Sequence, residues 1–410
     1  MDHFRNKIAQ RLGGESFGED TAIYKFEKIK RLKAEAAKIM PELKLIDMGV
    51  GEPDQPADET VVAILNEESG KACNRFYSDN GIPEYQIAAA SYMERVYNVK
   101  GLDPFANIVH GIGTKPILAM LPLCLIDPGD ISLMTVPGYP VLGTYTKYLG
   151  GEVHNLPLTE ENDFYPDLEG IPEDVCRRSK VLYINYPNNP TGQVATEDFF
   201  EKVIHFAKKK DVAVIHDAAY GALTYDGTKP LSFLSMPGAI QVGAEIQSMS
   251  KAFNMTGWRL GFLAGNQKLV SAYANIKDNT DSGQFRAIQK AGVYALSHTE
   301  LTETICEKYS RRFDLLVPAL NELGFHAKKP KGSFYCYVEK PMGAKNGVQF
   351  NTAFEAAEYL IMKANVSVVP WDDCGGFLRF SVTFEADGEE AERAIINELK
   401  QRLGGLGLTF

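Results

Sequence analysis

The residues best suited to chemistry lie in the segment SMSKAFNMTGWR, at positions 248–259. Lys251 stands just beyond a predicted buried strand, close to Ser248 and Ser250, and Arg259 follows eight residues later. A lysine that is partly desolvated loses its proton more readily, and its neutral amine can form a Schiff base with an aldehyde. Two serines and an arginine are groups that can clamp a phosphate. An ordinary charged surface loop would carry the same residue types, so this segment alone leaves both interpretations open.

A second candidate is Asp217, which follows a predicted strand at residues 212–216. An aspartate at the carboxyl end of a central strand points into the crevice where α/β sheets bind ligands. If it stays ionised there, it keeps a ring nitrogen protonated, and that makes a pyridine ring an electron sink. The alternative is a helix N-cap, a position that aspartate favours.

A third predicted strand, at residues 180–186, ends in the segment PNNPTG. Asn-Pro followed by Gly is a turn signal, and most such matches are only turns. Here the turn also falls at the carboxyl end of a strand. Three strands therefore bring Asn189, Asp217 and Lys251 to one edge of one sheet, and this combination is far more specific than any single motif.

The elements that must position these residues follow the pattern of an α/β protein. Charge-poor β-type runs alternate with helical runs, which predicts a mostly parallel central sheet. The predicted strands are residues 107–111, 130–136, 180–186, 212–216 and 243–248, and the clearest helices are residues 82–97 and 195–210. Beyond about residue 302 the pattern changes to a smaller α+β domain. We expect an N-terminal arm that is part of the small domain at 1–56, a large domain at 57–300 and a small C-terminal domain at 301–410.

The composition excludes several classes of function. The 410 residues contain 43 basic and 53 acidic side chains, a net charge of −10, which argues against a nucleic-acid or polybasic membrane surface. The longest apolar run, at residues 117–126, is far shorter than the about 20 residues that cross a bilayer. Neither the six scattered cysteines nor the seven histidines have metal-ligand spacing. We expect reduced thiols, no metal and a cytoplasmic location.

With these motifs together, the chain from about residue 24 onward resembles the fold-type I, pyridoxal-phosphate-dependent class I/II aminotransferases. Within that family, four segments are similar to those of the LL-diaminopimelate aminotransferases: NGI at 80–82, SKAFNMTGWR at 250–259, DNTDSGQF at 278–285 and PWDD at 370–373. The resemblance implies a fold-type I PLP-dependent transferase, with pyridoxal 5′-phosphate as the cofactor.

The resemblance also implies roles for individual residues. Lys251 would bind the cofactor aldehyde and act with Asp217 and Tyr220 in catalysis. The residues expected to contact the cofactor phosphate from the same subunit are Ser248, Ser250, Arg259 and the helix start at Thr114 and Lys115. Asp217 would pair with the ring nitrogen, and Asn189 and Tyr220 would hydrogen-bond the ring oxygen. Tyr139 would stack on the ring.

Substrate contacts and a dimer follow from the same resemblance. Arg379 would grip the substrate α-carboxylate, as the bidentate guanidinium fork suits. The other expected substrate contacts are Tyr24, Gly51, Lys115, Tyr139 and Asn189. Tyr77 and Ser282 match positions that reach the phosphate from a neighbouring subunit, which implies a homodimer with shared active sites.

We therefore expect an enzyme of lysine biosynthesis that transfers an amino group from LL-2,6-diaminopimelate to 2-oxoglutarate, giving tetrahydrodipicolinate and glutamate. Asp79, Asp278 and Asp281 are the candidates for binding the distal ammonium. Three alternatives are open: an aminotransferase for aspartate, alanine or an aromatic amino acid, a C–S lyase, and a ligand-sensing protein on the same scaffold.

Overall fold

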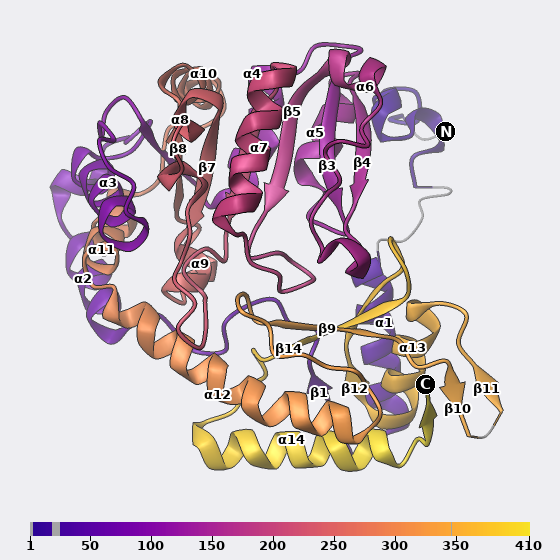
Figure 1. The fold of residues 1–410 in the computed structure, drawn as a ribbon. Coiled ribbons are helices and arrows are strands. Elements are labelled where there is room, and N and C mark those ends of the chain that lie inside the picture. The colour runs from indigo at the N-terminus through magenta and orange to yellow at the C-terminus, as the bar shows by residue number, and fades with distance from the viewer. Residues whose placement is uncertain (1–2, 19–24, 346) are drawn as a thin grey trace.

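The computed structural model describes residues 3–18, 25–345 and 347–410. Its larger part is built on a twisted sheet, in which the described residues contribute seven strands (Figure 1). In spatial order these are β2 (Ile108–Gly111), β8 (Gly261–Gly265), β7 (Gly243–Ser248), β6 (Ala213–Ala218), β5 (Ser179–Asn185), β3 (Ile131–Val136) and β4 (Glu152–Pro157). β8 pairs antiparallel with both of its neighbours, β2 and β7, and the other neighbouring pairs among these strands are parallel. The predicted α/β class with a mostly parallel sheet is confirmed.

All five predicted strands form, with ends shifted by no more than two residues. The strands missing from the sequence-based prediction are β4 and β8 in this sheet. β4 lies at the sheet edge and is largely solvent-accessible, so it lacks the run of apolar residues that marks a buried strand. β8 has the sequence GFLAG, and glycines at both ends weaken its strand signal.

Helices cover both faces of this sheet. Because successive side chains of a strand point to opposite faces, Val181 and Tyr183 of β5 join one apolar cluster and Leu182 and Ile184 join the other. The first cluster includes residues of α4 (Thr114–Leu125), α5 (Val141–Tyr148) and α10 (Gln267–Asp278). The second includes residues of α2 (Glu59–Ser69), α3 (Pro83–Tyr97), α7 (Glu197–Lys210) and α11 (Arg286–Ser297). Shorter helices are α6 (Glu173–Arg178), α8 (Ala239–Val242) and α9 (Met249–Ala252).

The smaller part of the molecule combines the C-terminal chain with a segment from near the N-terminus. Its helices are α1 (Lys25–Ile39), α12 (Glu300–Glu322), α13 (Ala353–Ala364) and α14 (Gly388–Gly404). An antiparallel sheet has the order β13 (Val369–Trp371), β14 (Phe377–Ser381) and β9 (Tyr335–Glu339), and β1 (Ile46–Asp47) pairs in parallel with β12 (Val366–Ser367). A third small sheet contains β10 (Gly343–Ala344), β11 (Val348–Gln349) and β15 (Leu408–Thr409). The domain boundaries at residues 56 and 300 stay predictions.

A buried ion network fixes the segment that leads from the first part of the chain to the site. The guanidinium of Arg312, fully buried in α12, contacts Asp54 and Glu392, each at 2.8 Å. Lys308 lies 2.8 Å from the other oxygen of Asp54. Burial alone would raise the pKa of Asp54, but the hydrogen bonds and charges of Lys308 and Arg312 outweigh it and lower that pKa. Asp54 is therefore held as an anion three residues after Gly51, and the loop containing both is anchored to α12.

None of the helices in the described ranges combines the length and the apolar character needed to span a bilayer.

Candidate functional site

The three strand-end residues that the sequence singles out come together at one edge of the large sheet. Asn185 of β5 lies opposite Asp217 of β6 in the sheet register. Its side-chain amide donates to the carbonyl of Asp217 at 2.7 Å, and its side-chain oxygen accepts from the backbone N–H of Asn189 at 3.0 Å. Lys251 lies in α9, which begins directly after β7, the strand next to β6. The predicted convergence of Asn189, Asp217 and Lys251 is what parallel neighbouring strands produce.

The amine of Lys251 is buried beside the loop that contains Gly51. Its Nζ donates to the carbonyl oxygen of Gly51 at 2.6 Å and lies 5.7 Å from the centre of the Phe334 ring. Burial lowers the pKa of this amine to about 8. The negative charge of Glu52 opposes the shift, and the cations Arg259 and Arg379 add to it. The result is a lysine that is substantially neutral near pH 8 and therefore available as a nucleophile.

This pKa gives a testable pH dependence. Only the neutral amine attacks an aldehyde, so we expect the rate at which the cofactor-free protein takes up pyridoxal phosphate to rise with pH, with a midpoint at about 8. Below that midpoint each pH unit removes about nine-tenths of the neutral amine. Stopped-flow absorbance between pH 6 and 10 measures the rate. A midpoint near 10.5, the value for an ordinary lysine, would contradict the shift.

Asp217 is a buried carboxylate with few partners. Its side chain accepts from the Tyr183 hydroxyl at 3.0 Å and from the backbone N–H of Ala219 at 3.2 Å. Burial raises the pKa of Asp217 above its ordinary value, and these two hydrogen bonds oppose the rise. The helix-cap alternative is wrong, because β6 continues to Ala218 and a turn follows it. A carboxylate buried in this way is suited to pair with a cationic N–H of a bound ligand.

A second cluster of donors lies where α4 and α9 begin. Ser248 caps α9, its hydroxyl accepting from the N–H of Ser250 at 3.1 Å. Gly113 precedes α4 with φ +75°, and a Cβ there would collide with the guanidinium of Arg259. Thr114 is the first residue of α4. The close approach of Arg259 to a helix N-terminus, with backbone N–H groups at the same point, is suited to an anion such as a phosphate.

Arg379 reaches the site from β14 in the smaller part of the molecule. Its guanidinium donates to the side-chain oxygen of Asn189 at 2.8 Å and to the carbonyl of Gly49 at 3.1 Å, and it lies 3.9 Å from the centre of the Tyr335 ring. Only 3% of Arg379 is exposed, and its Nε has no hydrogen-bond partner among the described residues. An anionic ligand would supply the missing acceptor.

Tyr220 and Gly51 connect the surroundings of Lys251 and Arg379, since Gly51 accepts from Lys251 and Tyr220 is hydrogen-bonded to Tyr335, the ring under Arg379. The hydroxyls of Tyr220 and Tyr335 are hydrogen-bonded at 2.9 Å. Burial, and then the neighbouring Tyr335, raise the pKa of Tyr220 well above its ordinary value, so Tyr220 stays a neutral hydroxyl. A Cβ on Gly51 would lie 2.8 Å from the Tyr335 hydroxyl, so a larger residue does not fit there. Gly51 thus allows its loop to approach both Lys251 and Tyr335 closely.

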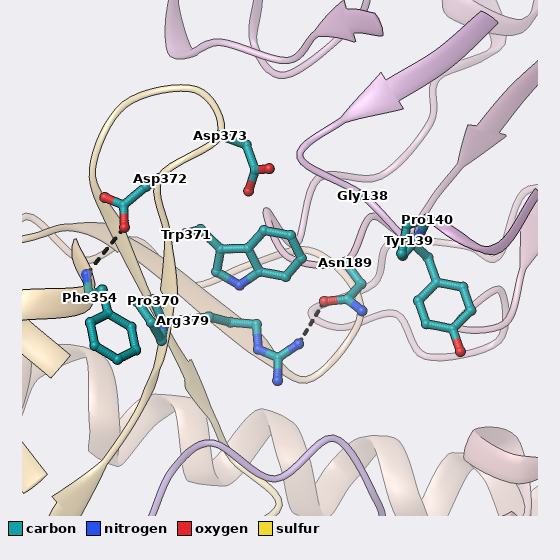
Figure 2. Close-up of a pocket in the computed structure, with 10 residues that line it drawn as sticks. All are labelled: Gly138, Tyr139, Pro140, Asn189, Phe354, Pro370, Trp371, Asp372, Asp373 and Arg379. Carbon is teal, nitrogen blue, oxygen red and sulfur yellow. Dashed lines mark hydrogen bonds between the residues drawn. The ribbon is translucent and has the colours of Figure 1, made fainter. Parts of the chain in front are cut away.

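Asn189 and Arg379 line a cavity of about 490 Å³ (Figure 2). Its lining residues are Gly138, Tyr139, Pro140, Asn189, Phe354, Pro370, Trp371, Asp372, Asp373 and Arg379. Burial raises the pKa of the Tyr139 hydroxyl, the charge of Asp217 adds to the rise and that of Arg259 opposes it. Tyr139 therefore lies within electrostatic reach of the buried carboxylate and the anion-binding cluster. The cavity has the size of a small-molecule site.

Other predicted site residues lie apart from this cluster. Lys115 is exposed on α4. Tyr77 and Ser282 lie on two neighbouring loops, and Tyr77 is 77% exposed. The loops meet where the backbone N–H groups of Ser78 and Asp79 both donate to the Ser282 carbonyl at 3.3 Å. The family resemblance implies that Tyr77 and Ser282 reach the site of a neighbouring subunit, and their roles stay predictions. Tyr24 lies outside the described residues.

Four residues of the site do not follow from the sequence argument. Tyr183 and Asn185 hold Asp217, and the alternation of β5 could have indicated them, since they point to the same sheet face as each other. Tyr335 and Asp373 come from the smaller part of the molecule, and no local spacing links them to the lysine segment.

The arrangement fits pyridoxal phosphate. The cluster of Arg259, Ser248, Ser250 and the α4 N-terminus matches the phosphate, the buried Asp217 carboxylate matches a protonated ring nitrogen, and Lys251 matches the aldehyde. The fit rests on the buried carboxylate of Asp217, which is complementary to a cationic ring N–H, and on the lowered pKa of Lys251, which makes its amine available to an aldehyde.

Comparisons with known proteins agree with this geometry. Residues 44–395 match the family model described as aminotransferase class I and II. The chain is 54% identical over its full length to the LL-diaminopimelate aminotransferase of Methanocaldococcus jannaschii and 52% identical to that of Methanococcus maripaludis, in each case covering 99% of the relative. A substrate-bound BacF structure from Bacillus subtilis superposes with a TM-score of 0.87 at 33% identity, over 98% of both chains.

Proposed function

This chain belongs to the class I and II aminotransferases, which use pyridoxal phosphate, and on that premise we propose that it transfers an amino group from LL-2,6-diaminopimelate to 2-oxoglutarate. The products are glutamate and the 6-oxo acid, which closes to tetrahydrodipicolinate with loss of water. The observation that carries the proposal is the likeness, over the whole chain, to enzymes named for this substrate. In this protein Lys251 and Asp217 lie at the same sheet edge as Asn189, which lines a cavity together with Arg379.

In this proposal the residues of the site bind different parts of the cofactor. Arg259, Ser248, Ser250 and the N–H groups at Thr114 would hold the phosphate, Asp217 would keep the ring nitrogen protonated, and Tyr139 would lie against the ring. Asn189 and Tyr220 would hydrogen-bond the ring oxygen. When bound, the cofactor supplies an electron sink for negative charge that develops on the α-carbon of the amino acid.

Lys251 has two tasks in this proposal. Its neutral amine would hold the cofactor through the aldehyde, and during amino transfer its Nζ would take the proton from the substrate α-carbon. Arg379 would hold the α-carboxylate through its guanidinium. The Nε of that guanidinium has no hydrogen-bond partner among the described residues, so it can donate to the carboxylate. Its hydrogen bond to Asn189 aligns it with the cofactor side of the cavity.

We further infer a homodimer with shared sites. The two loops with Tyr77 and Ser282 present an aromatic surface, in which Phe76, Tyr77 and Phe285 are 52%, 77% and 44% exposed. Exposed aromatic side chains grouped in this way are typical of a surface that another chain covers. If a second copy covers it, Tyr77 and Ser282 would reach the phosphate of the neighbouring site, as expected from the family.

We also infer a cytoplasmic location, in agreement with the biosynthetic reaction. The six cysteines all lie within the described ranges and none is paired in a disulfide. Free thiols are the usual state in a reducing compartment.

A donor screen tests the proposed reaction. We expect glutamate to form from 2-oxoglutarate with LL-diaminopimelate as the donor, and tetrahydrodipicolinate to accumulate in equal amount, both measured by mass spectrometry. Aspartate, alanine and phenylalanine serve as the comparison donors, and ammonia release tests for elimination. An enzyme that uses aspartate or alanine well and ignores diaminopimelate would refute the substrate while leaving the aminotransferase family assignment intact.

A further inference from the structure

The anion-binding cluster depends on an arginine whose backbone is in an unusual conformation. Arg259 follows the short helix η6 (Thr256–Trp258) with φ +57°, in the left-handed region that residues other than glycine rarely adopt. Its guanidinium donates to the carbonyl of Thr256 at 2.8 Å and lies against Gly113 at the start of α4. Because the backbone angles of Arg259 set the direction of its side chain, the surrounding contacts must hold that conformation for the guanidinium to stay there.

The side-chain amide of Gln284 supplies two of these contacts. Its Nε2 donates to the carbonyl of Trp258 at 2.7 Å and to the carbonyl of Arg259 at 2.8 Å. An amide nitrogen carries two hydrogens, and here both are used on the peptide groups at either side of Arg259. In an extended chain successive carbonyls point in opposite directions, so one amide could not reach both. The pair of hydrogen bonds therefore holds Arg259 out of the extended conformation.

His110 determines which way this amide faces. The Oε1 of Gln284 lies 2.9 Å from Nε2 of His110, and the amide nitrogen must face the two carbonyls because a carbonyl oxygen only accepts. Nε2 of His110 is then the donor. Burial lowers the pKa of His110 to about 4, so the ring is neutral near pH 7 and carries its one proton on Nε2. Its Nδ1 has no hydrogen-bond partner among the described residues, as suits an unprotonated nitrogen.

Gln284 thereby joins the two halves of the anion-binding cluster. His110 lies in β2, and the chain enters α4 at Thr114 soon after that strand ends. The backbone of Gln284 is itself fixed, since its N–H donates to Oγ of Ser78 at 3.1 Å and its carbonyl accepts from the same hydroxyl at 2.7 Å. The amide is therefore a link between the strand that leads to α4 and the backbone of Arg259.

We propose that Gln284, oriented by His110, is a positioning residue that holds the backbone of Arg259 so that its guanidinium meets the cofactor phosphate. This inference rests on the proposed function, in which Arg259 holds that phosphate. Without the amide, the left-handed conformation of Arg259 loses its support, and the guanidinium leaves the α4 N-terminus for part of the time. The loss falls on a ligand that carries a phosphate and spares one that does not.

The test compares pyridoxal phosphate with pyridoxal, which has the same ring and aldehyde but no phosphate. Binding of each to the cofactor-free protein is measured by absorbance titration. Gln284→Met keeps the length of the side chain but makes no amide hydrogen bond. We expect it to raise the Kd of pyridoxal phosphate about tenfold and to change that of pyridoxal by less than about twofold. The phosphorus NMR signal of the bound cofactor should also move towards that of the free cofactor.

His110→Phe is a second variant that leaves Gln284 in place. It keeps a ring but removes the donor that orients the amide, so the Kd of pyridoxal phosphate alone should rise, by about threefold. The double variant should bind no more weakly than Gln284→Met, because His110 acts through Gln284. If Gln284→Met does not fold, an unchanged ratio of the two Kd values in His110→Phe overturns the inference.

Gln86→Met is the matched control. Gln86 is a buried glutamine whose amide donates to the carbonyl of Ile108 in β2 at 2.9 Å, and it has no hydrogen bond to the Arg259 segment within the described residues. Its loss should lower the unfolding midpoint but leave the ratio of the two Kd values as in the wild type.

Arg259→Met separates the inference from its premise. If this variant binds pyridoxal phosphate as well as the wild type does, the phosphate role proposed for Arg259 fails and the inference fails with it. If Arg259→Met loses the preference for the phosphate, but Gln284→Met keeps it or binds both ligands equally worse, the inference is wrong although the proposed function stands.

Discussion

Replacing Lys251 with alanine is expected to lower kcat for amino transfer by about 10⁴-fold, the upper end of what a single acid–base residue contributes. The variant loses the buried amine whose pKa is lowered to about 8, which is the group proposed to move the α-proton. It also loses the nucleophile for the aldehyde. Single-turnover kinetics with pre-mixed cofactor and diaminopimelate separate the proton-transfer step from cofactor binding.

Borohydride reduction gives a readout of Lys251 that does not depend on turnover. In the wild-type protein the reduced pyridoxyl group should be found by peptide mapping on Lys251, and Lys251→Ala should carry none. Lys277 is the informative comparison, because it is also buried but its amine is paired with Asp281 at 2.6 Å. A reduced adduct on Lys277 or on any other lysine would contradict the assignment of Lys251.

The cofactor side of the site could be predicted from the sequence because its signals are local. Lys251, Asp217 and Asn189 each follow a charge-poor strand, and in a parallel sheet the carboxyl ends of such strands meet at one edge. The same logic explains why the prediction of strand positions was accurate: strands buried on both faces are recognised by their apolar runs. The edge strand β4 is half-exposed and lacks that signal.

The substrate side could be predicted only in part. Arg379 was identified through its motif, but Tyr335, which lies under its guanidinium, comes from a different strand of the smaller part of the molecule. Asp373 lines the same cavity as Asn189, because β14 of the smaller part meets the loop after β5, where Arg379 donates to the side-chain oxygen of Asn189. Such contacts depend on how two parts of the chain dock, which no spacing along the sequence encodes. The assignment of Tyr77 and Ser282 depends on a second chain.

Asp217→Asn is expected to reduce kcat by roughly 10²-fold or more, equivalent to about 3 kcal/mol of barrier. Asparagine has the same shape, and its side-chain oxygen still accepts from the Tyr183 hydroxyl or the N–H of Ala219, so the fold should be retained. What is lost is the negative charge. A neutral partner no longer holds the ring nitrogen protonated, and charge on the substrate α-carbon is then less stabilised. Pre-steady-state measurement of α-proton loss from deuterated donor reports this step directly.

Tyr183→Phe separates the charge of Asp217 from its positioning. It removes the 3.0 Å hydrogen bond to Asp217 but keeps the carboxylate, so we expect less than a tenfold loss in kcat. The larger loss in Asp217→Asn would then be due to the charge, because both variants lose or weaken contacts around the same buried group. Equal losses in the two variants would assign Asp217 a positioning role only. Near-normal turnover in Asp217→Asn would show that Asp217 has no role in catalysis, because its negative charge would then not be needed to keep the ring nitrogen protonated.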